Sequence, residues 1–424
     1  MKYIIKGGLQ LKGSISVSGN KNSVFPCIAA ALLTQDEVVL ENIADIKDTA
    51  VLMQILKKLG VSVKKEGSTV YIKADKIERF SLPQELMTKL RGSIVLAGAI
   101  LARLNKVYFY HPGGDIIGRR SIETHLEAFR ELGAFVKKDN LKYQLSFDKE
   151  SEEKAAKTID IFFKEASVTA TENLILASSL GKKTVVLRNC AKEPHIVDLC
   201  RMLISMGAKI EGMGTDILSI SGVEKLSGTR FRIRADYIEI GTYAVAAAIT
   251  GGKVKIEGID DTDLDPVFIP LSEFGVRFMK GDGFVEIDSL KLKSPVRLIT
   301  NIWPGFPTDM MSVAIVLASQ SKGVILCHDW MYESRMFFVD KLISMGANIT
   351  LSDPHRCLVY GPTKLKARNL ETPDIRAGMA LVLAALVAKG ESVINQAELI
   401  ERGYEDVVKK IRSLGARIER IEVN

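Results

Sequence analysis

The sequence predicts an α/β protein of two inside-out α/β barrel domains, each built from three repeats in which buried helices lie inside a shell of sheets. Two observations lead to this expectation. A glycine-containing motif recurs six times along the 424 residues, and each repeat also contains a helix that is apolar on all sides. Chains longer than about 250 to 300 residues usually divide into more than one hydrophobic core. Six repeats in a chain of this length therefore indicate two domains.

The recurring motif is a helix that ends in a hydrophobic residue and a glycine, followed by a short strand. Its copies have the letters LGVSV, LGAFV, MGAKI, FGVRF, MGANI and LGARI, and successive glycines are 68 to 74 residues apart. Glycine just past a helix readily adopts the left-handed conformation in which many helices stop. The sequence therefore predicts helix ends at Gly60, Gly133, Gly207, Gly275, Gly346 and Gly415.

Each repeat begins with a helix of small apolar residues that leads into a strand. These helices have the letters CIAAALL, SIVLAGAIL, NLILASSL, YAVAAAI, SVAIVLAS and ALVLAALV. A helix that is apolar around its whole circumference is buried on most sides. We therefore expect these helices inside each domain and the strands outside.

The last repeat stops at RIERIEVN, before its closing strand. The N-terminal segment YIIKGGLQLKGSISVSG has the same residue pattern as the segments that close other repeats. We therefore expect residues 1–20 to complete the sixth repeat. One domain would then span residues 21–234, and residues 1–20 and 235–424 would form the other. Two chain crossings between domains make a natural hinge. The alternative is one elongated solenoid, whose ends would need capping repeats.

Composition is ordinary for a globular protein, with 47% hydrophobic and 26% charged residues. No apolar run approaches the roughly 18 residues of a membrane span, and the first residues lack the apolar core of a signal peptide, so we expect no membrane association and a cytoplasmic location. The five cysteines form no CxxC pair, which indicates neither a disulfide framework nor a zinc site.

The formal charge of +7 does not point to nucleic acid, because Lys and Arg alternate with Asp and Glu and form no basic tract. The excess of positive charge fits a pocket for small phosphorylated ligands better. The sequence leaves the oligomeric state open, with a monomer as the expectation.

Charged residues collect at two loop positions in every repeat, at the start of the small-residue helix and after the strand that follows it. If all repeats share one geometry, these loops lie on one face of each domain. Helix N-termini attract anions, and Arg binds phosphate and carboxylate with paired hydrogen bonds. Taken singly, each cation could be a solvated surface charge. Together they predict an anion site with Lys21, Lys47, Arg91, Arg120, Arg335, Arg376 and Arg402.

The segment PGGDIIGRR at 112–120 carries three glycines around one acid, Asp115. This pattern is typical of a mobile lid that delivers the acid to reacting atoms. The competing interpretation is a plain turn whose Asp faces solvent.

Short motifs follow one another along the whole chain: SGNKNS, RGS, PGGDIIGRR, SVTATEN, EPHIVD, FPTDM, YESR, PDIRAG and ERGYE. This series resembles the UDP-N-acetylglucosamine 1-carboxyvinyltransferases, a family of enolpyruvyl transferases. The resemblance implies transfer of the enolpyruvyl group from phosphoenolpyruvate to the 3-hydroxyl of UDP-N-acetylglucosamine with release of phosphate. That reaction is the first committed step of peptidoglycan synthesis. The resemblance also implies inside-out α/β domains and no cofactor or metal.

The resemblance assigns roles to particular residues. Lys21, Asp115, Asp309 and Arg402 would be catalytic, with Asp309 accepting the proton of the acceptor hydroxyl. Cations would stabilise a tetrahedral adduct formed by protonation of C3 and attack of the sugar oxygen at C2. Phosphoenolpyruvate would be held by Lys21, Asn22, Arg91, Arg120 and Arg402, with added charge from Arg335 and Arg376. The nucleotide sugar would contact Arg91, Arg120, Ser121, Ile122, Glu123, Thr124, Ser167, Val168, Asp309 and Met331.

Several positions depart from the family pattern. Asp115 stands where the family usually has Cys, so a proton-donating Asp would need closure and desolvation around it. Fosfomycin alkylates that Cys in the family and should therefore fail to inactivate this chain covalently. Ser121, Glu123, His195 and Tyr237 also differ, all toward the nucleotide-sugar side.

Those departures leave other functions open. One is an enolpyruvyl transferase with a different nucleotide acceptor. The shikimate 3-phosphate branch fits less well because of the PGGD and SVTATEN segments. A non-catalytic nucleotide-sugar sensor would be expected to lack Lys21, Asp309 or Arg402, which are all present. A nucleic-acid clamp would need a basic inner surface, where apolar helices are expected.

Overall fold

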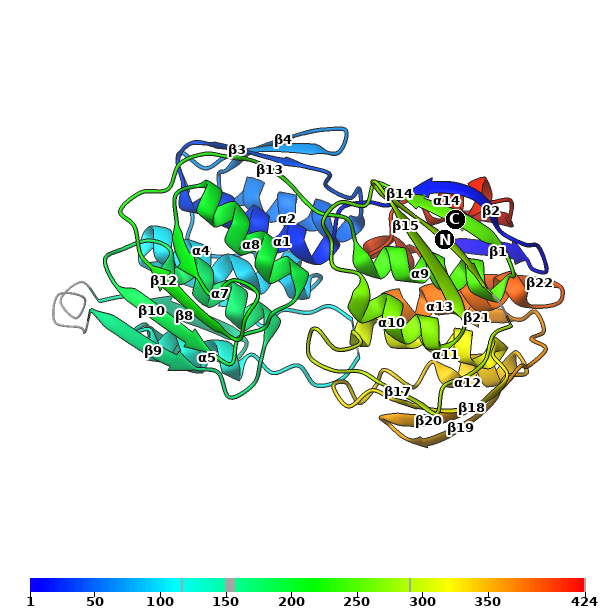
Figure 1. Cartoon of the computed structure of the whole chain (residues 1–424). Coiled ribbons are helices and arrows are strands. Elements are labelled where there is room, and N and C mark those ends of the chain that lie inside the picture. Colours follow the sequence, from blue (N-terminus) through cyan, green and yellow to red (C-terminus); the bar gives the residue numbers. More distant parts are fainter. Residues whose placement is uncertain (116, 149–156, 290, 423–424) are drawn as a thin grey trace. The chain divides into compact units, whose positions relative to one another are not determined.

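The computed structural model describes residues 1–424 except 116, 149–156, 290 and 423–424. Contacts divide the chain into two compact units (Figure 1). Unit 1 consists of Met1–Ser18, Asp115–Arg119 and Ala235–Asn424, and unit 2 consists of Gly19–Gly114 and Arg120–Arg234. The main departure from the expected domains is the segment Asp115–Arg119, which clusters with unit 1 although the chain on both sides of it belongs to unit 2.

Unit 2 contains three small-residue helices that contact one another and are buried over most of their length. They are α1 (Lys21–Ala30), α4 (Leu96–Leu104) and α7 (Val168–Ser178). Each repeat adds an amphipathic helix whose apolar face packs inward, and one short helix also belongs to this unit. These are α2 (Lys47–Lys58), α5 (Glu123–Glu131), α8 (Pro194–Ser205) and the short α3 (Gln84–Met87).

The strands of unit 2 form three sheets, with the strand orders β13-β3-β5-β4, β6-β8-β7 and β11-β12-β10-β9. The strand that ends one repeat pairs in parallel with the next repeat: β9 pairs with β10, and β13 returns to β3. This return closes a ring of three repeats and rules out the solenoid for this unit. The bounds are β3 (Glu37–Glu41), β4 (Ser62–Glu66), β5 (Thr69–Lys73), β6 (Lys106–Tyr110), β7 (Phe135–Asp139), β8 (Lys142–Ser146), β9 (Thr158–Phe162), β10 (Thr184–Arg188), β11 (Lys209–Glu211), β12 (Ile217–Ser221) and β13 (Arg230–Arg232).

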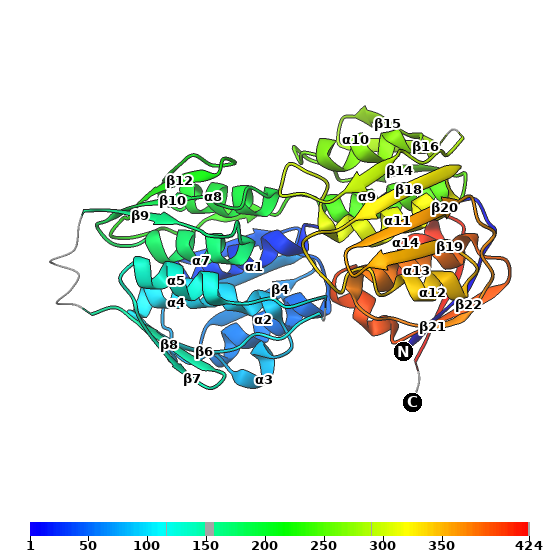
Figure 2. The ribbon, with the colours of Figure 1, turned by 90° about the horizontal axis from the view of Figure 1, so that it is seen from below.

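Unit 1 repeats this architecture, with its central helices in mutual contact and its strands outside them (Figure 2). Every residue of α9 except Ile249, and every residue of α13 except Val387, is buried. The predicted fold class, with helices inside and sheets outside, is therefore confirmed. The central helices are α9 (Tyr237–Ile249), α11 (Met311–Gln320) and α13 (Ile375–Val387), and the amphipathic ones are α10 (Asp265–Glu273), α12 (Val339–Ser344) and α14 (Val407–Ser413).

The three sheets of unit 1 have the orders β15-β16-β14-β2, β17-β18-β20-β19 and β21-β22-β1-β23. β1 lies between β22 and β23 and is antiparallel to both, so the N-terminus completes the sixth repeat as predicted. The bounds are β1 (Lys2–Lys6), β2 (Lys12–Ser16), β14 (Lys253–Glu257), β15 (Val276–Gly281), β16 (Phe284–Ser289), β17 (Arg297–Ile299), β18 (Gly323–His328), β19 (Asn348–Asp353), β20 (Arg356–Gly361), β21 (Asn369–Glu371), β22 (Glu391–Asn395) and β23 (Arg417–Ile421).

The expectation that all of residues 1–20 complete the sixth repeat is wrong for β2. β2 pairs in parallel with β14 of the fourth repeat, because each repeat sends its last strand into the sheet of the next one. β2 thereby closes the ring of unit 1, as β13 closes that of unit 2.

All six motif glycines have a positive φ, between 90° and 103°, as the predicted helix stops require. In the part of the chain that the structure describes, no helix combines the length and the apolarity needed to cross a membrane.

Candidate active site

Lys21 is the first residue of α1 and is held there by two features. Asn20 caps the helix, since its side chain accepts hydrogen bonds from the N–H groups of Asn22, at 2.8 Å, and Ser23. Nζ of Lys21 lies 2.8 Å from the carboxylate of Asp48, and both side chains are at least nine-tenths buried. Breaking a buried ion pair is costly, so Lys21 has a fixed position. Lys47, which the sequence also offered as a cation, is exposed; its neighbour Asp48 is the residue that reaches Lys21.

Arg91 and Arg120 are brought together at Gly114. A Cβ atom at Gly114 would lie 2.9 Å from Cβ of Arg91 and 3.4 Å from Nη2 of Arg120, and the φ of this residue is +116°. Nη2 of Arg91 also donates to the carbonyl oxygen of Ser121 at 3.1 Å. Glycine at position 114 therefore lets the backbone lie against two predicted phosphoenolpyruvate ligands.

The predicted nucleotide-sugar residues of unit 2 lie at the starts of α5 and α7. Oγ of Ser121 accepts the N–H of Glu123 at 3.0 Å, which starts α5, and Ser167 caps α7. Nε2 of His125 lies 2.9 Å from Oγ1 of Thr169 and links the two helices. Burial, together with the charge of Arg91, lowers the pKa of His125 to about 3, so this link is neutral. Ile122 and Thr124 belong to the same segment at the start of α5.

In unit 1, two buried arginines donate hydrogen bonds to the carboxylate of Asp309. This residue lies in the 3₁₀ turn η3 (Thr308–Met310) before α11. Oδ1 accepts from Nη2 of Arg335 at 3.0 Å, and Oδ2 accepts from Nε of Arg376 at 3.0 Å. Arg335 is 2% and Arg376 6% exposed, whereas Asp309 keeps 29% of its side chain accessible. The fork fixes the carboxylate and leaves it within reach of a ligand.

Both arginines keep their charge despite burial. Desolvation lowers the pKa of Arg335, but the charges of Asp309, Asp374 and Asp329 raise it by more than desolvation lowers it. The pKa of Arg335 therefore lies above its usual value. The pKa of Arg376 is likewise lowered by desolvation and raised more strongly, above all by Asp309. Asp309 therefore faces two charged guanidinium groups, while Asp374 and Asp329 also act on Arg335.

Arg402 ends the 3₁₀ turn η4 (Ala397–Arg402), and its Nη1 donates to Oδ1 of Asp115 at 2.7 Å. Each of the two side chains is 18% exposed. The segment that carries Asp115 makes further contacts within unit 1, while its Ile116 lies outside the described residues. The N–H of Arg119 donates to Glu333 at 2.8 Å, and the N–H of Ser334 donates to the carbonyl of Ile117 at 3.1 Å. Asp115 is thus an ion-pair partner of Arg402, and the interpretation as a solvent-facing turn is wrong.

Three further side chains around Arg376 had no assigned role in the sequence reasoning. The ring of Tyr404 lies 5.1 Å from the guanidinium of Arg376, and its hydroxyl lies 3.0 Å from Oγ1 of Thr242. Asp374 caps α13 by accepting the N–H of Arg376 at 2.8 Å. The motifs PDIRAG and ERGYE contain Asp374 and Tyr404, but only the fold shows that Tyr404 lies against the guanidinium of Arg376 and that Asp374 accepts its backbone N–H.

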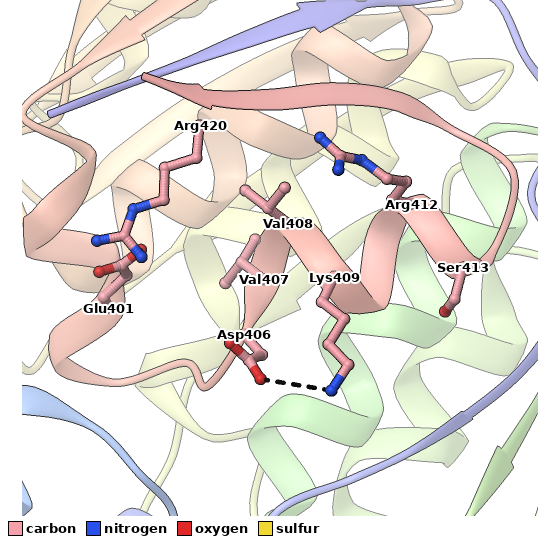
Figure 3. Close-up of a pocket in the computed structure, with 8 residues that line it drawn as sticks. All are labelled: Glu401, Asp406, Val407, Val408, Lys409, Arg412, Ser413 and Arg420. Carbon is pink, nitrogen blue, oxygen red and sulfur yellow. Dashed lines mark ion pairs between the residues drawn. The ribbon is translucent and has the colours of Figure 1, made fainter. Parts of the chain in front are cut away.

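A surface pocket of about 440 Å³ in unit 1 is separate from these groups (Figure 3). Its cations already have partners: Nη1 of Arg420 lies 3.4 Å from Glu401, and Arg412 donates to the carbonyl of Ile418. None of the predicted site residues lines it, so this hollow is not the predicted site. Its lining consists of Glu401, Asp406, Val407, Val408, Lys409, Arg412, Ser413 and Arg420.

Comparisons with known proteins agree with the fold and show the family of this chain. The model of the EPSP synthase (3-phosphoshikimate 1-carboxyvinyltransferase) family matches residues 5–411. A UDP-N-acetylglucosamine 1-carboxyvinyltransferase of Treponema denticola is 45% identical, and the protein of that name from Borreliella burgdorferi is 44% identical, each over 99% of both chains. The enolpyruvyl transferase NikO from Streptomyces tendae has a TM-score of 0.86 over 99% of this chain and 98% of its own, and at 24% identity it supports the fold alone. The chain therefore belongs to the EPSP synthase family and, within it, to the UDP-N-acetylglucosamine 1-carboxyvinyltransferases.

Proposed function

We propose that this chain transfers the enolpyruvyl group of phosphoenolpyruvate to the 3-hydroxyl of UDP-N-acetylglucosamine and releases phosphate, the first committed step of peptidoglycan synthesis. The observation that carries the proposal is the carboxylate of Asp309, partly accessible and held by the buried arginines 335 and 376. The family to which the chain belongs supports the same reaction.

Asp309 accepts the proton of the acceptor hydroxyl in this proposal. The side chain of Asp309 is 29% exposed, so the acceptor hydroxyl can approach a carboxylate oxygen and donate to it. Fixing the base before the substrate arrives avoids reorganisation during the reaction. The deprotonated sugar oxygen then attacks C2 of phosphoenolpyruvate.

The cations are proposed ligands of phosphoenolpyruvate and of the adduct formed from it. The proposed cations are Lys21, Arg91 and Arg120 in unit 2 and Arg402 in unit 1, with Arg335 and Arg376 adding positive charge; the neutral amide of Asn22 is a further proposed ligand. Arginine forks suit a phosphate and a carboxylate, and their charge stabilises the tetrahedral adduct.

Asp115 is the proposed acid. Once protonated, Asp115 gives its proton to C3 of phosphoenolpyruvate as the sugar oxygen attacks C2. The adduct then expels phosphate while a C3 proton returns to the Asp115 carboxylate, which restores the double bond. Asp115 shares the guanidinium of Arg402 in this structure; an incoming phosphate competes for that guanidinium, and Asp115 must bind a proton before it can act as the acid. We further propose that this Asp takes the place of the Cys expected from the family pattern.

Two of the four departures from the family pattern do not favour another acceptor. Tyr237 and His195 are each 3% exposed, and the ring of Tyr237 packs 5.2 Å from that of Trp303. Both side chains are therefore almost entirely withdrawn from solvent in this structure. From the family resemblance we propose that the nucleotide sugar contacts Ser121, Ile122, Glu123, Thr124, Ser167, Val168 and Met331.

The test is phosphate release from phosphoenolpyruvate with UDP-N-acetylglucosamine, shikimate 3-phosphate or other uridine nucleotides as acceptor. We expect release with UDP-N-acetylglucosamine alone, and its loss in Asp309→Asn. Release only with another nucleotide would make the chain a paralogue, and no release with any acceptor would favour a sensor.

A further inference from the structure

Asp329 is a fully buried carboxylate, 0% exposed, that the proposed reaction does not use. It directly follows β18 and begins the loop that carries Met331 and Arg335. A buried charge is costly unless it is paired and hydrogen-bonded, so the partners of Asp329 indicate what it is for.

The partners of Asp329 lie around the proposed base. Thr308, the residue before Asp309, donates its hydroxyl to Oδ2 of Asp329. Oδ1 of Asp329 accepts the backbone N–H of Met331 at 3.0 Å, and Oδ2 lies 4.0 Å from Nε of Arg335. One carboxylate thus holds the neighbour of Asp309 and faces the guanidinium that binds Asp309.

The backbone of Asp329 is itself fixed. Its N–H donates to the carbonyl of His355 at 2.9 Å, and its carbonyl oxygen lies 2.7 Å from Nδ1 of His355. His355 lies in the turn between β19 and β20, and β20 pairs with β18 along its whole length. A group held on a sheet positions its neighbours more precisely than a group on a loose loop does.

We propose that Asp329 is a positioning residue for the acceptor base. It holds Thr308 and Arg335 so that the carboxylate of Asp309 stays where it meets the acceptor hydroxyl. A misplacement of about 1 Å costs on the order of 100-fold in rate, so a group that never touches substrate has a large effect on turnover. This inference rests on the function proposed above.

The competing account is that Asp329 only stabilises the loop after β18. Substitution would then lower the fraction of folded protein and leave turnover per folded molecule unchanged. The two accounts differ in kcat measured on folded protein, and in whether Asp329 and Thr308 act together.

The experiment compares wild type with Asp329→Asn, Thr308→Val, the double variant and the control Asp353→Asn. The Asn substitution keeps the shape of Asp329 and removes its charge, and Val removes the Thr308 hydroxyl. Asp353 lies in the same hairpin as His355, and its carboxylate accepts the N–H of His355 at 2.8 Å and Nε of Arg356 at 2.7 Å. Phosphate release gives kcat and KM, and near-UV circular dichroism gives the folded fraction.

We expect kcat to fall roughly 10- to 100-fold in Asp329→Asn and by a smaller factor in Thr308→Val, with KM for phosphoenolpyruvate within about twofold of wild type. The double variant should be no worse than Asp329→Asn, since two residues that act through one hydrogen bond are not additive. Asp353→Asn keeps a side-chain oxygen that can accept the N–H of His355 and removes only the charge that faces Arg356, so it should match wild type.

Wild-type kcat in folded Asp329→Asn, or effects that multiply in the double variant, would overturn the inference. If Asp329→Asn does not fold, Thr308→Val decides, because unchanged kcat in that variant also contradicts the proposal. Failure of wild type itself to release phosphate would instead overturn the proposed function and the inference with it.

Discussion

Nη1 of Arg402 donates a hydrogen bond of 2.7 Å to Oδ1 of Asp115, and both side chains are largely withdrawn from solvent. These residues are far apart in the sequence, and the pair forms because Asp115–Arg119 packs with unit 1. The proposed acid therefore lies on a cation that the proposed reaction assigns to phosphoenolpyruvate.

Two substitutions of Asp115 should test its role as an acid and its effect on covalent inactivation by fosfomycin. Asp115→Asn should lower kcat by at least about 100-fold, since positioned proton donors contribute roughly 10² to 10⁴. Asp115→Cys should keep activity and gain one covalent fosfomycin adduct, which intact mass after incubation with drug and UDP-N-acetylglucosamine detects. A stable adduct on the wild-type chain would contradict the account.

Gly118 should be needed for the docking of the segment that carries Asp115. A Cβ atom at this residue, whose φ is +141°, would lie 2.3 Å from Oε2 of Glu333, the residue that accepts the N–H of Arg119. Gly118→Ala should therefore reduce kcat by about tenfold or more, because it shifts Asp115. The control is Gly181→Ala, where φ is also positive but no atom lies within 4 Å. Equal kcat in the two variants would argue against docking.

Lys21 and Asp48 should depend on each other for stability. Asp48→Asn leaves the buried ammonium without its carboxylate and should lower the free energy of unfolding by about 3 to 5 kcal/mol. The double variant Lys21→Met, Asp48→Asn should recover part of that loss yet release no phosphate, because the ammonium is a proposed ligand. Urea denaturation and the phosphate assay measure the two effects; equal stability of the single and double variants would show that the pair is not coupled.

Glu172 should make stability depend on pH. Burial, with a smaller contribution from the charge of Glu193, raises the pKa of Glu172 well above its usual 4.5. The folded state therefore retains a proton that the unfolded chain has lost, so this residue lowers stability progressively as pH rises above about 4.5. Glu172→Gln should be more stable than wild type at pH 8, with the difference shrinking toward pH 4.

The control for that experiment is Glu127→Gln, which alters a surface pair with Lys164 and should show no such pH-dependent difference. A gain for Glu172→Gln that is the same at pH 4 and pH 8 would contradict the assignment of a raised pKa. Chemical denaturation across this range supplies both curves.

Local sequence signals predicted the inner helices and the six glycine stops, because periodicity and helix ends are properties of neighbouring residues. The sheet that β2 joins could not be predicted in this way. Both the sixth and the fourth repeat accept an alternating strand, and the choice depends on ring closure rather than on the strand itself.

Parts of the site that depend on tertiary packing also escaped prediction. Asp329 is a single acid after a strand, and only the fold brings it to Thr308 and Arg335. The sequence could not show whether Lys47 or its neighbour Asp48 reaches the site. Which of two adjacent side chains faces inward depends on how α2 packs on the core. The contact between Arg119 and Glu333 likewise joins distant parts of the chain.

The most direct test of the central claim is mass spectrometry of UDP-N-acetylglucosamine after incubation with phosphoenolpyruvate and either wild type or Asp309→Asn. The account predicts that the nucleotide sugar gains one enolpyruvyl group with wild type, in step with phosphate release, and gains none with the variant. Phosphate release without a modified nucleotide sugar, or full product formation by folded Asp309→Asn, would contradict it.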